Sequence, residues 1–559
     1  MRTAAAPSDT ATARWVLFAT ISASSMAFIG GSALNVALPA IQSDLGASGA
    51  DLLWIVNAFA LLLAALILVG GSLGDHFGRK RVYLIGIIVF TVSSFVCGIA
   101  PTTSILIVAR AVQGIGGALM VPGSLAIISA YFGEEKRGEA IGTWASFTTL
   151  TSVLGPVLGG ILAENGLWRG VFFINIPLGI AATYALVTRV PESKDDEAPK
   201  ELDFLGAFLV TLGMAGITYG FIELGREPGE PVEPFVIGAL IVGVLGLSAF
   251  VLQEARSAHP MMSLKLFRSR TFSGANLLTL FLYGALGGAL FFIPLNLVQV
   301  QGYGETRAGF ALLPFSILLV LMSRWAGGLV DKYGPRPPLT VGPLIVGFAF
   351  FALALPGITS GPDAYWTTFF PGFLLIGIGM GITVAPLTTT VMGSVPQHNA
   401  GVASGINNAV SRSSQVFATA IMGGLALVIF GAALGASLDD ITLPDEARAT
   451  LDENAADLGA MAIPDQLDAE TTATVREAIN ASFVEMFRIM MIAGAVLSWL
   501  SAGLAYVTIE PKLSEVRAQL RQELADSESD DDDVDCQHVP CLDQQLSAVT
   551  NDPRPSGAD

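Results

Sequence analysis

The chain has 559 residues, of which 52% are hydrophobic and only 14% are charged. A soluble globular protein carries about 25% charged residues, so this composition excludes an ordinary soluble protein and indicates one dissolved mainly in lipid. The formal net charge of -18 does not indicate a nucleic-acid partner, because the acid excess lies mainly in residues 439–477 and in the tail after Asp526, and no cluster of basic residues suggests such a partner.

Apolar runs that are long enough to cross a bilayer, roughly 20 residues each, recur fourteen times along the chain. In chain order they are 15–39, 52–73, 82–100, 104–131, 140–163, 169–189, 204–223, 234–253, 272–299, 307–330, 338–356, 366–391, 401–436 and 484–507. The first run is too long for the apolar core of a signal peptide and is followed by further spans, so we expect it to be retained as a helix.

The Lys and Arg residues of the loops predict the orientation of these spans. If the N-terminus is cytoplasmic, the loops on that side hold most of the basic residues, beginning with Arg79, Lys80 and Arg81. The opposite loops then hold only Arg169, Arg226, Arg307, Arg448 and Arg476. By the positive-inside rule we expect a multi-pass protein of the inner (cytoplasmic) membrane with both termini in the cytoplasm.

The chain is internally repeated. The loop after the second span and the loop after the tenth share a Gly/Asp pattern, centred on Asp75 and Asp331, and the first and ninth spans begin at a similar offset. We therefore predict an all-α polytopic membrane protein with two six-helix bundles, 15–190 and 272–508, and two inserted helices, 204–253. Repeated halves with a site at their interface are the architecture of alternating-access transporters.

Three segments lie outside the predicted spans. Residues 1–14 are expected to be a cytosolic N-terminus, and residues 438–483 a long acidic loop on the outer side. Residues 509–559 are expected to form a short cytosolic helix and an acidic disordered tail, which could dock a cytosolic partner.

The loop after the second span is the strongest motif of the sequence. Its small and charged residues are Gly71, Asp75, Gly78, Arg79 and Lys80. A tight cationic turn would be one explanation, but a degenerate copy with Asp331 and Gly334, and with Pro335 at a basic position, follows the tenth span. The pattern resembles the signature of the major facilitator superfamily. That resemblance implies a cytoplasmic latch, or conformational gate, that stabilises the outward-facing state.

Arg110 lies within the fourth span, where a charged side chain costs roughly 2.5–3.5 kcal/mol on insertion scales and so normally faces a cavity or a partner. Extension of the side chain toward the outer surface is the alternative. With Gln113, the segment resembles the motif of proton-coupled members of the superfamily. The resemblance implies that Arg110 takes part in proton transfer and that both residues line the substrate cavity.

The fifth span carries a proline among glycines: Gly155, Pro156, Gly159 and Gly160. As a bare pattern this is a kinked helix with a surface for close packing. Within the superfamily it resembles the motif of exporters, although Thr151 stands where that motif has a further glycine.

With fourteen spans, the chain resembles the drug:proton antiporter family over residues 14–508. The resemblance implies export of small lipophilic or amphipathic compounds by proton antiport. Asn35 and Arg412 extend the match as candidate cavity or coupling residues, and helix-packing hydrogen bonds are the alternative role for the amides. Relatives often carry an Asp where this chain has Gly30, so the proton-coupling group is not identified. Glu223 is the most embedded acid, and an interfacial position is the favoured explanation for it.

No catalytic constellation or phosphate-binding loop is present, so we expect no enzyme activity or cofactor. Cys536, His538 and Cys541 of the tail could bind a soft metal, but their spacing is not that of a familiar closed site, so we expect no metal. Two rival functions remain open at this stage. One is export of a specific metabolite, lipid or siderophore without proton coupling through a carboxylate of the first span. The other is a membrane scaffold or membrane enzyme with the acidic tail as a docking segment.

Overall fold

The computed structural model describes residues 10–132, 134–193, 203–226, 232–257, 260–396 and 399–511. These residues form fourteen helices that are long and apolar enough to cross a membrane, as the hydropathy pattern predicts. The predicted cytosolic helix and acidic tail, and most of the N-terminal segment, lie outside the described residues.

The first eight spans include the two inserted helices. They are α1 (Thr10–Leu45), α2 (Gly49–Phe77), α3 (Arg79–Gly98), α4 (Thr103–Tyr131), α5 (Glu134–Glu164), α6 with α7 (Gly170–Phe173 and Asn175–Arg189), α8 (Phe204–Leu224) and α9 (Pro234–Arg256). A short 3-10 helix, η1 (Leu264–Arg268), leads from α9 into the second half.

The last six spans include several broken helices. They are α10 (Arg270–Leu295) with its π-helical turn η2 (Asn296–Val300), α11 with α12 (Glu305–Ala311 and Leu313–Ala326), α14 (Arg336–Ala354), α16 (Phe370–Gly393), α17 (Ala400–Asp439) and α19 (Ala469–Thr508). Between them lie α13 (Leu329–Tyr333), η3 (Gly361–Ala364), α15 (Tyr365–Thr368), α18 (Asp445–Glu453) and η5 (Asn454–Ala460).

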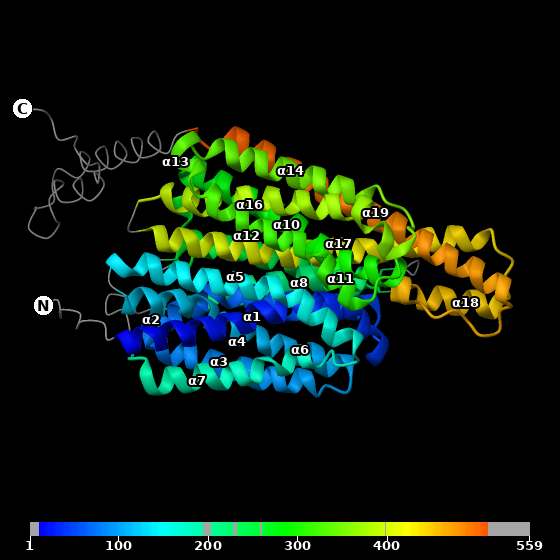
Figure 1. Cartoon of the computed structure of the whole chain (residues 1–559), viewed down its shortest axis with the longest axis horizontal. Helices are drawn as coiled ribbons and strands as arrows, with labels where there is room; N and C mark the ends of the chain where they lie inside the picture. Colours follow the sequence, from blue (N-terminus) through cyan, green and yellow to red (C-terminus); the bar gives the residue numbers. More distant parts are fainter. Residues whose placement is uncertain are drawn as a thin grey trace, which may run out of the picture. The chain divides into compact units, whose positions relative to one another are not determined.

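The two halves pair their helices in the same way. In the first half the first span packs on the fifth and sixth, and the fourth packs on the second and third; in the second half α10 packs on α17 and α19, and α16 packs on α12 and α14. Figure 1 shows the blue-to-cyan helices of the first half on one side and the green-to-orange helices of the second half on the other. The sequence repeat therefore corresponds to a repeated packing of six helices.

The two inserted helices, α8 and α9, pack on each other, and α8 also contacts α2 of the first half and α17 of the second. Glycines on the facing sides allow this close approach: a Cβ on Gly216 would lie 2.6 Å from the backbone oxygen of Ala239, and a Cβ on Gly243 would lie 2.6 Å from the backbone nitrogen of Ile217. Small residues are the usual means by which helices approach closely in a membrane.

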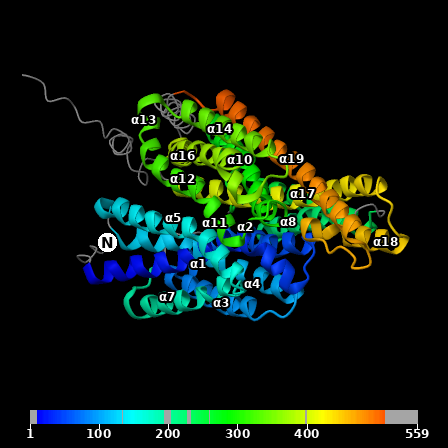
Figure 2. The same cartoon turned by 45° about the vertical axis from the view of Figure 1, so that its right-hand side comes forward.

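The bundle has two ends, named here for what they carry. The terminal end holds the start of α1 and the end of α19, and the loop end holds residues 440–468. Figure 2 shows α18 beyond the bundle at the loop end, opposite the start of α1. The predicted loop 438–483 was too long, because α19 begins at Ala469, where the Asp468 side chain caps it, rather than at residue 484. These first turns are polar, so hydropathy does not reveal them.

Candidate functional site

The turn between α2 and α3 lies at the terminal end and is held by charged groups. Arg79 donates from Nε to Asp75 Oδ1 at 2.7 Å, one helical turn away. Lys80 donates from Nζ to the carbonyl oxygens of Val190 at 2.7 Å and Val187 at 3.3 Å. Asp75, Arg79 and Lys80 therefore lie together at this turn, and Lys80 binds the end of α7 and the residue that follows it, within the first half.

Gly78 is required at this turn. Its φ of +106° lies in a region that side chains rarely adopt, and a Cβ there would lie 2.9 Å from the carboxyl carbon of Glu192. Glu192 in turn accepts from the backbone N–H of Lys80 at 2.9 Å. The absence of a side chain thus lets a carboxylate reach the first turn of α3, where negative charge is favoured.

The second copy of the turn, between α13 and α14, keeps part of this arrangement. Gly334 has a φ of +78°, and Arg336 donates from Nε to the carbonyl oxygen of Ile509, which follows α19, at 2.7 Å. Each turn therefore binds the segment after the last helix of its own half. Asp331, however, is exposed and forms no ion pair with another described residue, unlike Asp75.

Arg110 of α4 is the largest fully buried side chain of the described residues, with 1% of its surface exposed. It donates from Nε to the carbonyl oxygen of Ile55 on α2 at 3.1 Å and from Nη1 to Gln113 Oε1 at 2.7 Å. Gln113 then donates to Ser94 Oγ on α3 at 2.7 Å, and Asn175 of α7 donates to the same oxygen at 3.4 Å. One polar chain thus connects four helices of the first half.

Aromatic faces complete the surroundings of Arg110. Its guanidinium carbon lies 4.3 Å from the ring centre of Phe59 and 6.0 Å from that of Phe172, and it forms no ion pair with another described residue. The rings attract the cation through their quadrupoles. The side chain does not extend to the outer surface, so that alternative is wrong. In this conformation Arg110 and Gln113 are sealed within the first half.

The motif of α5 provides contacts within and between the halves. A Cβ on Gly155 or Gly159 would collide with α1, at Ser32 and Ala33 respectively. A Cβ on Gly160 would collide with the backbone of α11, at Glu305. Gly155 and Gly159 thus let α5 pack on α1, and Gly160 lets it pack on the second half.

Further contacts join the halves at the loop end. Glu164, at the end of α5, accepts from the backbone N–H of Thr306 at 3.0 Å. Gln42 of α1 donates to the carbonyl oxygen of Asp457 in η5 at 3.0 Å and accepts from Gln299 of η2 at 2.7 Å. The segment η5 therefore lies across both halves.

At the terminal end, α5 and α17 have few neighbouring atoms around their glycines. A Cβ on Gly138 or Gly142 of α5, or on Gly401 of α17, would have no neighbouring atom within 4 Å. A Cβ on Gly405 would meet only Leu68, at 3.8 Å. Glycines that are packed against a partner at the loop end thus have counterparts that face open space at the terminal end.

Glu223 of α8 lies near the loop end and is fully paired. It accepts from Trp54 Nε1 of α2 at 2.8 Å and from Arg226 Nε at 2.6 Å, and Arg226 also pairs with Asp51 at 3.3 Å. This geometry fits an interfacial clamp between α8 and α2.

Asn35 and Arg412 are both partly buried. Arg412 of α17 interacts electrostatically with Tyr283 of α10. Five residues earlier on the same helix, Asn407 donates to Thr279 of α10 at 2.7 Å. These contacts lie in the second half, so the structure does not bring Arg412 into the Arg110 cluster.

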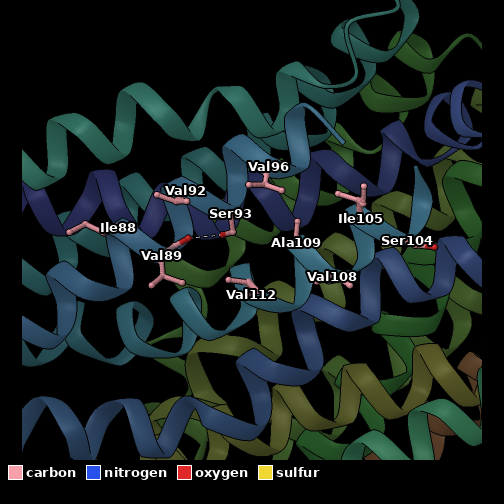
Figure 3. A pocket seen from close by; sticks show the side chains of 10 residues that line it. All are labelled: Ile88, Val89, Val92, Ser93, Val96, Ser104, Ile105, Val108, Ala109 and Val112. Atoms are coloured by element: carbon pink, nitrogen blue, oxygen red, sulfur yellow. Dashed lines mark hydrogen bonds between the residues drawn. The ribbon is translucent and has the colours of Figure 1, made fainter. Parts of the chain in front are cut away.

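A groove of about 600 Å³ lies between α3 and α4 (Figure 3). Its lining is apolar except for two serines, and Val92 and Val108 are among its exposed side chains. Ser93 donates to backbone oxygens of its own helix. The groove is on the side of the first half that faces lipid, away from the second half, and Arg110 does not line it.

Sequence reasoning missed several residues of these networks. Ser94, Trp54 and Glu192 are each the partner of a predicted residue, but they come from other segments of the chain. A serine in a membrane helix is common, so only the three-dimensional contact identifies Ser94. Of the three, only Glu192 could have been picked out from the sequence, because it is an acid that directly follows Pro191 at the end of the sixth span.

The sequence of this chain matches the family described as Major Facilitator Superfamily over residues 20–419. It is 29% identical to the tetracenomycin C resistance and export protein of Streptomyces glaucescens, covering 85% of this chain and 87% of that protein. It is 32% identical to the multidrug resistance protein Stp of Mycobacterium tuberculosis (strain CDC 1551 / Oshkosh), covering 74% of this chain and 76% of that protein.

Solved structures share the fold. An inward-facing, occupied bacterial homolog of the human lysosomal transporter Spinster superimposes with a TM-score of 0.59 at 19% identity, covering 90% of this chain and 97% of that chain. An auto-inhibited peptide transporter of the POT family has a TM-score of 0.61 at 15% identity, covering 89% of this chain and 96% of that chain.

Proposed function

This chain belongs to the major facilitator superfamily, and from that membership we propose that it exports small lipophilic or amphipathic compounds by proton antiport and alternating access. The printed names of the relatives, which are antibiotic and multidrug resistance or export proteins, support the export of such compounds. The observation that carries the proposal is the packing of α5, whose exporter-type Gly160 lies against α11 of the second half while Gly155 and Gly159 hold α5 on α1.

The direction of opening follows from the two ends of the bundle. The halves are joined at the loop end by Glu164, Gln42 and η5, whereas glycines at the terminal end face open space. The basic loop residues, such as Arg79 and Lys80, lie at the terminal end, which supports its placement in the cytoplasm. The structure then corresponds to an inward-facing state that is ready to receive a compound from the cytoplasm or the inner leaflet.

Arg110 is proposed to couple transport to protons. A buried guanidinium that rests on a carbonyl oxygen, an amide and aromatic rings is held only by neutral groups. Rocking of the first half would change these contacts, and the chain Arg110–Gln113–Ser94 offers hydrogen-bonding groups through which that change reaches α3. The gate at Asp75 would stabilise the outward-facing state, with Asp331 as a weaker counterpart.

Transport in inverted membrane vesicles tests the function. Vesicles that contain the chain should accumulate a lipophilic cationic dye when a proton gradient is imposed, and an uncoupler should abolish the uptake. Growth of a sensitive host on a panel of toxic compounds, with and without the chain, would identify the substrates. Uptake that persists in full with the uncoupler would contradict proton antiport while leaving export intact.

Replacement of Arg110 tests the coupling role. We expect Arg110→Ala to lower proton-driven uptake at least roughly tenfold, because it removes the charge and leaves Gln113 and the Ile55 carbonyl without their partner, at a cost of about 1–3 kcal/mol. Arg169→Ala, which removes a partly buried arginine that pairs with Asp44 at the loop end, away from the Arg110 cluster, is the control and should retain most of the activity. Equal activity of Arg110→Ala and the control would exclude a coupling role.

One observation favours a second candidate function. Gly30 occupies a position where the family that the chain resembles often carries an Asp, so this chain has no carboxylate there. An exporter of a specific metabolite, lipid or siderophore that is not coupled through this position would fit that absence. Dye uptake that needs no proton gradient, together with resistance to a single compound class, would favour it.

A further inference from the structure

Two carboxyl groups meet at the terminal end of the inserted helices. Asp203 caps the start of α8, and Glu254 lies in the last turn of α9. Gly206 lies between them: a Cβ built on it would be 2.9 Å from Asp203 Oδ2 and 3.0 Å from Glu254 Oε1. Both oxygens therefore point at the same small space, one from each helix.

Each carboxyl group has one oxygen bonded and one oxygen without a partner. Asp203 Oδ1 accepts from the backbone N–H of Gly206 at 2.6 Å, and Glu254 Oε2 accepts from the backbone N–H of Met262 at 2.7 Å. The other two oxygens, Asp203 Oδ2 and Glu254 Oε1, both border the space at Gly206, are buried and accept no hydrogen bond. Glu254 has only 3% of its surface exposed.

No described cation neutralises this pair. The nearby basic side chains of α9 and η1, namely Arg256, Lys265 and Arg268, are exposed, and none forms an ion pair with either carboxylate among the described residues. An unpaired buried carboxylate is costly, and two of them that face each other are more so. Two carboxyl groups in such a position lower this cost by keeping one proton between them.

We propose that Asp203 and Glu254 form a proton-binding site in which the two carboxyl groups share one proton at the terminal end of the inserted helices. The proton resides on one of the facing oxygens, and the other accepts it directly or through one water. The site satisfies the two orphan oxygens at once, and it needs no ligand beyond the proton. It is independent of the Arg110 cluster and stands whether or not export is proton-driven.

The site has a mechanical consequence. Glu254 also holds the backbone of Met262, which lies in the linker from α9 to the second half. Loss of the shared proton would place two negative charges around Gly206, and the resulting repulsion would push the Glu254 side chain and the linker away from α8. The pair would therefore make the docking of this linker sensitive to the pH at the terminal end.

Infrared difference spectroscopy tests the site on the full chain, reconstituted in vesicles of phosphatidylethanolamine and phosphatidylglycerol. A protonated carboxyl group has a carbonyl band that shifts in D₂O, and exposed acids lose it above pH of about 4–5. We expect one such band to persist above that range in the unmodified chain and to disappear in both Glu254→Gln and Asp203→Asn. Both variants keep the oxygen that accepts from Met262 or Gly206, so the fold should survive.

Matched variants complete the test. Glu233→Gln, which removes an exposed acid at the other end of α9, should leave the band unchanged. Gly206→Ala, which inserts a methyl group at the point where the two oxygens meet, should shift or abolish it. The proposal is wrong if the band is absent from the unmodified chain or survives in Glu254→Gln and Asp203→Asn. Loss of the band on addition of sodium chloride at constant pH would also overturn it, because it would identify a metal-cation site.

Discussion

The two ends of α5 are packed in opposite ways. At the loop end, Gly160 lies against the backbone of α11 in the second half, and Glu164 accepts a hydrogen bond from that helix. At the terminal end, Gly138 and Gly142 of the same helix have no atom within 4 Å of where a Cβ would be. Along α5, the glycine at the loop end is therefore packed against the second half, whereas the glycines at the terminal end contact no neighbouring helix.

Helix α17 shows the same contrast in the second half. A Cβ on Gly423 would collide with the side chain of Leu53 on α2 of the first half, whereas Gly401 faces open space. An alternating-access transporter closes one end while it opens the other. The free glycines of α5 and α17 are therefore expected to be the surfaces that meet when the terminal end closes.

The largest expected effect comes from adding a large side chain to α5 at the loop end, where the two halves are in contact. Gly160→Leu should overpack the contact with α11 at a cost of about 1–3 kcal/mol, which shifts the equilibrium toward a state open at the loop end by roughly 5- to 150-fold. Gly142→Leu should leave the loop end closed, because Gly142 lies at the terminal end, where a Cβ would meet no neighbouring atom. Spin labels at Ser43 and Asp363, on opposite halves at the loop end, report the difference as a longer distance in Gly160→Leu only.

That comparison fails if both variants, or neither, lengthen the distance. In either case the packing of glycines would not determine which end is open. Transport alone would not distinguish the two variants, because the leucine at Gly142 is expected to hinder the later closure of the terminal end.

A smaller effect is expected from the two gate turns at the terminal end. Asp75→Asn removes the ion pair with Arg79, whose side chain is 19% exposed, whereas Asp331→Asn removes no ion pair with a described residue. A partly exposed pair contributes up to about 1 kcal/mol. We expect efflux to fall roughly fivefold in Asp75→Asn and to stay near that of the unmodified chain in Asp331→Asn. Initial rates of dye transport, normalised to the amount of protein, measure this.

Equal losses in the two variants would mean that the repeated pattern, rather than the local pairing, governs the gate. A loss of efflux in Asp331→Asn alone would mean that the second turn is the more important of the two, and it would contradict the role assigned to Asp75.

The sequence predicted the fold well because lipid imposes a simple rule. Every span must be apolar over a fixed length, so all fourteen helices could be located from hydropathy. The start of α19 was missed because residues 469–483 are polar and extend the helix beyond the apolar span. Helix formation there depends on the Asp468 cap and on packing, neither of which contributes to hydropathy.

The site was predicted in part, for a related reason. Arg110 and Gln113 are one turn apart on one helix, so their hydrogen bond follows from helical spacing. Ser94 and the carbonyl oxygen of Ile55 come from other helices, and no pattern along the chain specifies which helix faces which. The buried oxygens of Asp203 and Glu254 were missed in the same way, since each residue lies at a helix end that hydropathy treats as solvated.

The smallest expected effect concerns η5, which closes the loop end. Burial raises the pKa of Asp457, and the nearby charge of Asp51 raises it further. The folded state therefore binds this proton more tightly than the unfolded segment does. The added stability of η5 is complete below the ordinary pKa of about 3.9 and is lost as the pH rises through the raised value. Hydrogen exchange of residues 454–460 should thus quicken modestly over that range.

Asp457→Asn should make this exchange independent of pH, because the amide stays neutral throughout. Asp440→Asn, an exposed acid on the same loop, should leave the pH dependence intact. A slower exchange at higher pH, after correction for the intrinsic rate, would give the opposite sign and would mean that Asp457 stabilises η5 as a carboxylate. The closed end of the bundle would then be strengthened, rather than loosened, by loss of the proton.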